Sequence, residues 1–177
     1  MNIHVCTPFA RDKNLAKAYN ETFSRCPDDD WLCLIDHDTM FLTSDAIHIM
    51  YDYVEKFPET GLFTAFCNRI HPLAQDQLFF GTPSDDFDVK NWAYRARIQS
   101  KSETKVTEIK RTISGFLMLV HKCVWNSIKF RGLGCLGVDN NFSADVLDSG
   151  RKIYRMDRVV VWHSYRIENI KDKSHLR

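Results

Sequence analysis

The feature that most constrains the fold is a short apolar run that ends in two carboxylates. Residues Trp31–Ile35 are continuously apolar and lead directly into Asp36 and Asp38. A run of this length that stops abruptly at polar residues is typical of a strand buried on both faces. In open α/β sheets, ligands bind just beyond the carboxyl ends of such strands. The sequence therefore predicts a buried strand that delivers both aspartates to a ligand-binding edge.

Strand-like and helix-like patterns alternate along the first part of the chain. Residues 3–8 read as a strand that Pro8 ends, and Asn14 is a plausible N-cap for the amphipathic helix that follows. A further strand is expected at 62–67, after a second helix. Helical crossovers of this length permit parallel pairing. We therefore expect an α/β fold with a mostly parallel central sheet flanked by helices. A chain of 177 residues is long enough for one domain with a proper core, so we expect a single compact domain.

The alternation fails between about residues 68 and 110. Gly81, Pro83 and a charged stretch interrupt the pattern, so we predict an irregular insertion that forms a partly ordered lid. Order returns with an apolar strand over Phe116–Val120, and Gly115 before it indicates a close approach of backbone or ligand.

Two further residues, Asp139 and His163, are expected near the same edge of the sheet. Three glycines in six residues precede Asp139, which either caps the next helix or faces the cleft. Two short strands, Ile153–Tyr154 and Val159–Trp162, are expected last, and His163 follows the second. A histidine in that position is more often a packed residue than a ligand, but an aspartate pair at the same edge shifts those odds.

The two aspartates have the chemistry of a divalent-cation site. Residues two apart on a strand face the same way, and a bend at the strand end lets Asp36 and Asp38 converge. Like charges that close repel one another unless a cation joins them. Hard oxygen ligands with an imidazole nearby suit Mg²⁺ or Mn²⁺. The Asp-x-Asp pattern also occurs by chance in surface loops, so the prediction depends on the strand before it.

Composition narrows the class of protein. The chain has 24 basic and 23 acidic residues, and this balance gives no support for broad binding to nucleic acid or membrane surfaces. No apolar run is long enough to be a transmembrane segment, and the start lacks a signal-peptide pattern. Six cysteines without C-x-x-C spacing read as reduced core residues, so we expect a cytoplasmic protein.

The order of these motifs resembles the GT-A glycosyltransferases, especially those similar to family 2 and the mucin-type transferases. The resemblance covers most of the chain except the middle segment. It rests on five motifs in order: Thr7-Pro8, Leu34-Ile-Asp-His-Asp38, Ser114-Gly115-Phe116, Gly137-Val-Asp139, and a late strand ending in His163.

The resemblance implies a GT-A-like, Rossmann-like fold and a set of site residues. It implies Mn²⁺ or Mg²⁺ bridging Asp38, His163 and a donor diphosphate, with Asp36 near the ribose or the metal. Asp139 matches the general base of inverting members. The residues expected to contact the donor are Thr7, Pro8, Arg11, Asp36, Gly115 and Arg166. Arg11 is equally well read as an exposed basic residue beside a helix start.

These inferences predict a metal-dependent, inverting glycosyltransferase. Its donor would be a nucleotide sugar, UDP- or GDP-linked, and its acceptor an unknown glycan, lipid or protein. Two alternatives stay open. One is a nucleotidyltransferase on a similar sheet, and the other is a non-catalytic module that binds a nucleotide or sugar.

Overall fold

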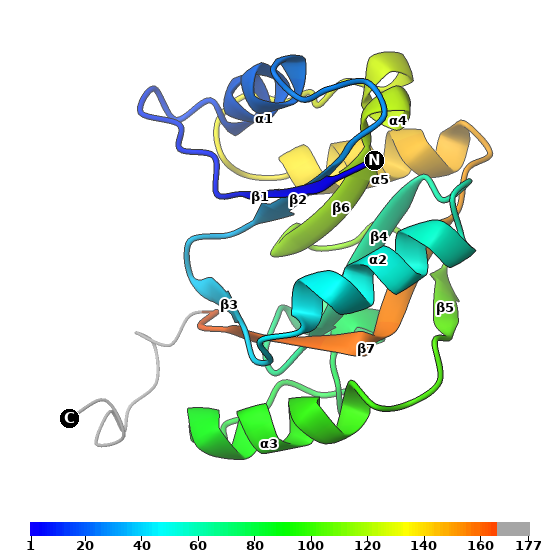
Figure 1. The fold of residues 1–177 in the computed structure, drawn as a ribbon. Helices are drawn as coiled ribbons and strands as arrows, with labels where there is room; N and C mark the ends of the chain where they lie inside the picture. Colours follow the sequence, from blue (N-terminus) through cyan, green and yellow to red (C-terminus); the bar gives the residue numbers. More distant parts are fainter. Residues whose placement is uncertain (166–177) are drawn as a thin grey trace.

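The computed structural model describes residues 1–165, apart from the side chains of residues 72 and 73, and has helices packed on both faces of one sheet (Figure 1). The strands are β1 (Ile3–Cys6), β2 (Trp31–Ile35), β3 (Thr39–Phe41), β4 (Leu62–Cys67), β5 (Val106–Ile109), β6 (Leu117–His121) and β7 (Ile153–His163). The helices are α1 (Leu15–Ser24), α2 (Ala46–Lys56), α3 (Val89–Gln99), α4 (Lys122–Ser127) and α5 (Val138–Asp148), with a 3₁₀ segment, η1 (Pro72–Gln77).

The seven-stranded sheet is mixed, so the prediction of a mostly parallel sheet was wrong. Its order is β1-β2-β6-β4-β7-β3, and β5 also pairs with β7. β1 is parallel to β2 and β4 is parallel to β7, but β6 lies between β2 and β4 and is antiparallel to both. β3 and β5 are antiparallel to β7. The early strand-helix alternation does give strands that run in one direction, namely β1, β2 and β4. A long connection precedes β6, and its length permits either strand direction.

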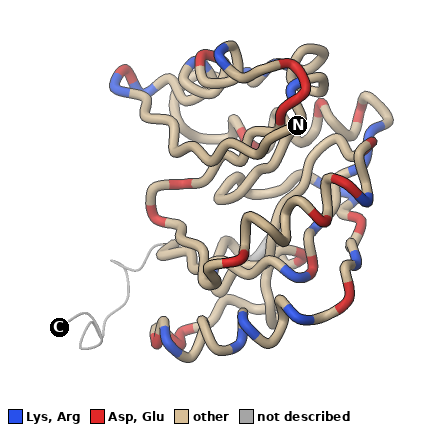
Figure 2. Tube along the Cα trace, in the orientation of Figure 1, with Lys and Arg blue, Asp and Glu red and all other residues tan. Residues whose placement is uncertain are grey.

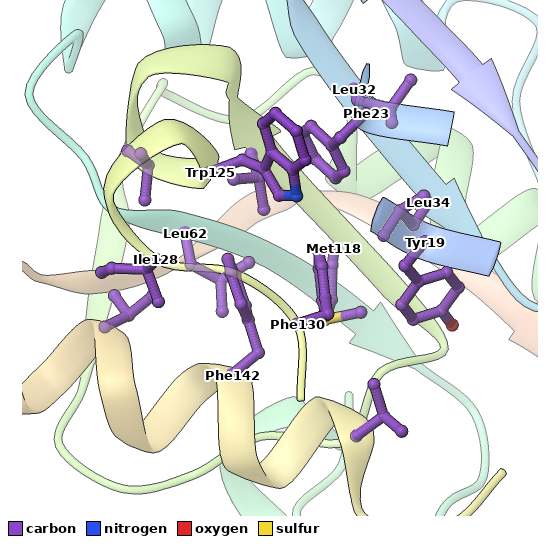
Figure 3. Packing of buried hydrophobic residues seen from close by; sticks show 14 of the residues in the cluster. Tyr19, Phe23, Leu32, Leu34, Leu62, Met118, Trp125, Ile128, Phe130 and Phe142 are labelled. Carbon is purple, nitrogen blue, oxygen red and sulfur yellow. The ribbon is translucent and has the colours of Figure 1, made fainter. Parts of the chain in front are cut away.

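Strand β2 is buried on both faces, as its continuous apolar run predicted. Leu32 and Leu34 point to the side covered by α1, α4 and α5, where they share a cluster with Phe142 (Figure 3). Trp31 and Cys33 belong to the cluster beneath α2. Because successive side chains of a strand point to opposite faces, one short run supplies both cores. Full burial of a leucine contributes about 1.5–3 kcal/mol, so β2 is a strong anchor for the aspartates that follow it.

Helix α1 begins where the sequence predicted. The side-chain oxygen of Asn14 accepts a hydrogen bond from the Lys17 N–H at 3.0 Å, which is the expected N-cap contact. Its apolar face buries Tyr19 and Phe23, and Phe23 stacks on Trp125 of α4 with ring centroids 5.5 Å apart (Figure 3). This packing holds Tyr19 against the carboxyl end of β2.

The middle segment carries regular structure that the sequence did not predict. In α3, Trp92 and Ala96 are buried against Val160 and Trp162 of β7, and β5 extends the sheet by pairing with β7. The expectation of an irregular insertion was therefore wrong for 89–99 and 106–109. Only those two α3 side chains are fully buried among charged neighbours, so the helical period is weak in the sequence.

β7 is one strand, although two short strands were expected. Its register with β4 shifts between Ala65 and Phe66, where β7 accommodates extra residues between Met156 and Val160. This irregularity accounts for the break in its apolar pattern. The strand continues to His163, which therefore lies beside the carboxyl end of β4.

All six cysteines are free. Cys26, Cys33 and Cys67 are buried, in agreement with the expected core role, but Cys123 and Cys135 are exposed. Within residues 1–165, no helix is long and apolar enough to cross a membrane.

Candidate metal centre

One edge of the sheet gathers the polar side chains that the sequence analysis singled out. β1, β2, β4 and β7 end at this edge, and β6 begins there because it is antiparallel to β2 and β4. Asp36 follows β2, Asn68 follows β4, and His163 is the last residue of β7. The Asp36 N–H donates to the Phe116 carbonyl at 3.0 Å, which ties the start of β6 to the end of β2.

A tight turn brings the two aspartates to one place. The Thr39 N–H donates to the Asp36 carbonyl at 3.0 Å, which closes a turn between β2 and β3. Thr39 then pairs with His163, and the Ser164 N–H donates to the Asp38 carbonyl at 2.9 Å. As a result, one ligand atom from each of Asp36, Asp38 and His163 lies within 4.8 Å of the others. These are the three residues that the sequence proposed as metal ligands.

The imidazole of His163 is held in one orientation. Its Nδ1 lies 3.0 Å from the Arg69 carbonyl, which can only accept, so Nδ1 carries the hydrogen. In the neutral ring the lone pair is therefore on Nε2, which lies 3.5 Å from Asp38 Oδ1. The ring is buried and stacks on Phe116 at 5.3 Å. Metal-binding histidines characteristically donate their second nitrogen to a carbonyl or carboxylate in this way.

The two aspartates have opposite electrostatic environments. Burial raises the pKa of Asp36 to about 6, against the effect of His163 and with a further contribution from Asp38 and Asp139. When His163 is protonated, Nε2 also carries a hydrogen, and its hydrogen bond to Asp38 lowers the pKa of that carboxyl. A cation would offset the cost of ionising buried Asp36. Two carboxylates and an imidazole with its lone pair on Nε2 fit the donor sets of Mn²⁺ or Mg²⁺.

Asp139 approaches the same site from α5. The helix has Gly137 at its N-cap, so Asp139 lies in the first turn instead of capping it. The Gly115 N–H donates to Asp139 Oδ2 at 2.7 Å. A Cβ added to Gly115 would lie 2.7 Å from the Cβ of Asp139. The close approach expected at Gly115 is thus made by the Asp139 side chain, and it fixes that carboxylate beside β6.

Gln77 braces this contact, and the sequence analysis missed it. Its Oε1 accepts from the Ser114 N–H at 2.8 Å, and its Nε2 donates to the Ser114 carbonyl at 2.9 Å and to Thr64 Oγ1 at 2.8 Å. The side chain is buried. Gln77 thereby fixes the peptide before Gly115. No periodic pattern marks a glutamine in a 3₁₀ segment, so the sequence held no signal for this role.

A cavity of about 530 Å³ lies beside the metal centre. Thr7, Pro8, Tyr19 and Asp36 line it, together with Cys135 from the loop before α5. Burial, together with the charges of Asp36 and Asp139, raises the pKa of Tyr19, so its phenol stays neutral. Asp36 is shared between this cavity and the metal ligands, so one carboxylate connects the two.

Arg11, which was expected to contact the donor, does not line the cavity beside Asp36. It lines a neighbouring hollow of about 450 Å³ with Asp12 and Lys17. The expected contact from Arg166 lies outside the described residues.

No protein-family model matches the chain, and no curated protein matches it either. The site combines a candidate divalent-cation site, an adjoining cavity and a separate, oriented carboxylate.

Proposed function

We propose that the protein is a metal-dependent glycosyltransferase that moves a sugar from a nucleotide-sugar donor to an acceptor. The observation that carries the proposal is the orientation of His163. Its Nδ1 is committed to the Arg69 carbonyl, so its Nε2 is available beside Asp38 and Asp36. These three side chains would hold Mn²⁺ or Mg²⁺, which when bound supplies positive charge to a leaving diphosphate.

The cavity beside Asp36 supports a donor with a nucleotide. Its lining combines the apolar surface of Pro8 and Tyr19 with the polar Thr7, as expected for a small-molecule site. A UDP- or GDP-linked sugar placed there would direct its diphosphate toward the ligands. Asp36, which belongs to both regions, would contact the ribose or the ion.

Asp139 would act as the general base. In an inverting displacement, the acceptor oxygen bonds to the sugar carbon while the bond to the diphosphate breaks. The acceptor hydroxyl must lose its proton in that step. The Gly115 N–H holds Oδ2 of Asp139, so the carboxylate has a fixed direction, and it accepts the proton.

The test is calorimetric titration of UDP and GDP with and without Mn²⁺, followed by a donor-hydrolysis panel. We expect nucleotide binding that strengthens with Mn²⁺. His163→Ala should weaken the Mn²⁺-dependent part at least about tenfold, the lower end of the effect of losing an outer-sphere partner of a metal ligand. His48→Ala, at an exposed position of α2, is the matched control and should bind as the wild type does.

The products separate the proposal from its alternatives. A glycosyltransferase releases a nucleoside diphosphate from the donor and forms a glycoside. Formation of a nucleotide sugar and pyrophosphate from a nucleoside triphosphate and a sugar 1-phosphate, or the reverse reaction, would instead identify a nucleotidyltransferase. Binding with no turnover of any donor would indicate a binding module.

A further inference from the structure

The most exposed large apolar side chains of the described chain are Leu133, Leu136 and Phe9, which are 95%, 90% and 85% exposed. We call these three residues the apolar tip. Transfer of apolar surface out of water lowers the free energy. In the isolated protein these three side chains stay in water, so their burial against a partner would be favourable. Such exposure indicates a surface that contacts a partner.

Two loops that contact one another supply the three side chains. The Leu15 N–H donates to the Gly134 carbonyl at 3.1 Å, and Cys135 Sγ lies 3.3 Å from the Lys13 carbonyl. Phe9 and Cys135 also line the same cavity. The loops lie beside α1, at the end of the molecule opposite α3 (Figure 1). Phe9 therefore lines the cavity that contains Asp36, and Leu136 follows Cys135, which lines it too.

The charges around the apolar tip favour one kind of partner. Arg11 and Lys13 are exposed on the Phe9 loop, whereas Asp12 is paired with Lys17 at 3.1 Å. Figure 2 shows that basic and acidic residues lie together on the loop that precedes α1. Residues 9–17 thus carry three basic groups against one acidic group. Basic side chains near an anionic membrane surface each add attraction, and apolar side chains beside them insert at the headgroup boundary. The balanced charge of the whole chain conceals this local excess.

We propose that the apolar tip docks on the surface of a bilayer that contains anionic lipids. Leu133, Leu136 and Phe9 enter the interface, and Arg11 and Lys13 lie among the headgroups. The cavity then opens at the membrane surface. For the proposed transferase this implies an acceptor carried by a lipid, and only that consequence rests on the proposed function.

The test is co-sedimentation with phosphatidylcholine vesicles, with and without phosphatidylglycerol. We expect binding to the anionic vesicles, reduced by salt. Leu133→Ser with Leu136→Ser should weaken partitioning by at least about tenfold, because burial of even one leucine is worth that factor. Ile98→Ser is the matched control, because Ile98 is also exposed, at 56%, but lies on α3. Its partitioning should equal that of the wild type.

Several results would overturn the proposal. Equal binding of the double variant and the wild type would remove the apolar tip from the interface. Equal binding to neutral and anionic vesicles would remove the role of Arg11 and Lys13. Absence of vesicle binding, with a concentration-dependent dimer that the double variant abolishes, would identify a second copy as the partner. Thermal unfolding should be unchanged in all variants, since the substituted side chains are largely exposed.

Discussion

Substitution of Gly115 by alanine tests the contact that positions Asp139. Gly115 does not have a positive φ, so its backbone accepts alanine without strain. The added Cβ would lie 2.7 Å from Asp139 Cβ and 3.3 Å from Oδ2. The nearest atom is the first atom of the Asp139 side chain, which cannot rotate away. The start of α5 must therefore move relative to β6.

The size of the effect follows from the distance. Ordinary contact begins at 3.4 Å, so the 2.7 Å approach requires a shift of about 0.7 Å. Overpacking of this kind costs about 1–3 kcal/mol in unfolding free energy. For a chain of this length each kcal/mol lowers Tm by about 2–4 °C, so Tm should fall by several degrees. If Asp139 is the general base, as proposed, a displacement approaching 1 Å should also reduce turnover by about 10²-fold.

The assay is a double-mutant cycle measured by urea denaturation. Asp139→Gly removes the clashing Cβ, so Gly115→Ala should cost at least about 1 kcal/mol less in that background than in the wild type. Asp139→Asn keeps the Cβ and is the control, in which the cost should persist. If Gly115→Ala costs the same within about 0.5 kcal/mol in all three backgrounds, the steric reasoning is wrong.

Three further substitutions test the proposed base Asp139, the buried Gln77 and the buried carboxylate of Asp30, which lies away from the site. Asp139→Asn should lower turnover by about 10²–10⁴-fold, measured with a verified acceptor, while Mn²⁺-dependent nucleotide binding stays unchanged. Gln77→Leu should lower the unfolding free energy by about 1–3 kcal/mol, because it removes the hydrogen-bond partner of the half-buried Ser114 N–H and carbonyl and of the buried Thr64 hydroxyl. Urea denaturation measures this, and an unchanged midpoint would contradict it. The hydrogen bond from His4 lowers the pKa of Asp30 to about 2, below its ordinary 3.8. Charged Asp30 therefore stabilises the fold above pH 3.8, and this contribution is lost as pH falls through 2. Near neutral pH, Asp30→Asn should be less stable than the wild type. At the acid end of a pH series of unfolding curves, the two proteins should be equally stable.

Local patterns were sufficient for the elements that lead to the site. The run Trp31–Ile35 predicted a strand buried on both faces, because each of its residues had to be covered whichever way it pointed. Asn14 predicted the start of α1, since an N-cap is a contact between near neighbours. Gly115 predicted a close approach, because a missing side chain is visible in the sequence. The sequence did not predict that the approaching group is the side chain of Asp139.

Contacts between distant segments were decided only by the tertiary structure. The direction of β6 depends on how a long connection packs, and it places Gly115 against Asp139. The tautomer of His163 depends on the Arg69 carbonyl, a backbone group that every residue carries and no sequence pattern marks. The exposure of Leu133 and Leu136 also depended on tertiary packing, because their apolar character alone predicts burial. The local sequence determines which side chains each segment must bury, whereas the site forms where segments distant along the chain pack against one another.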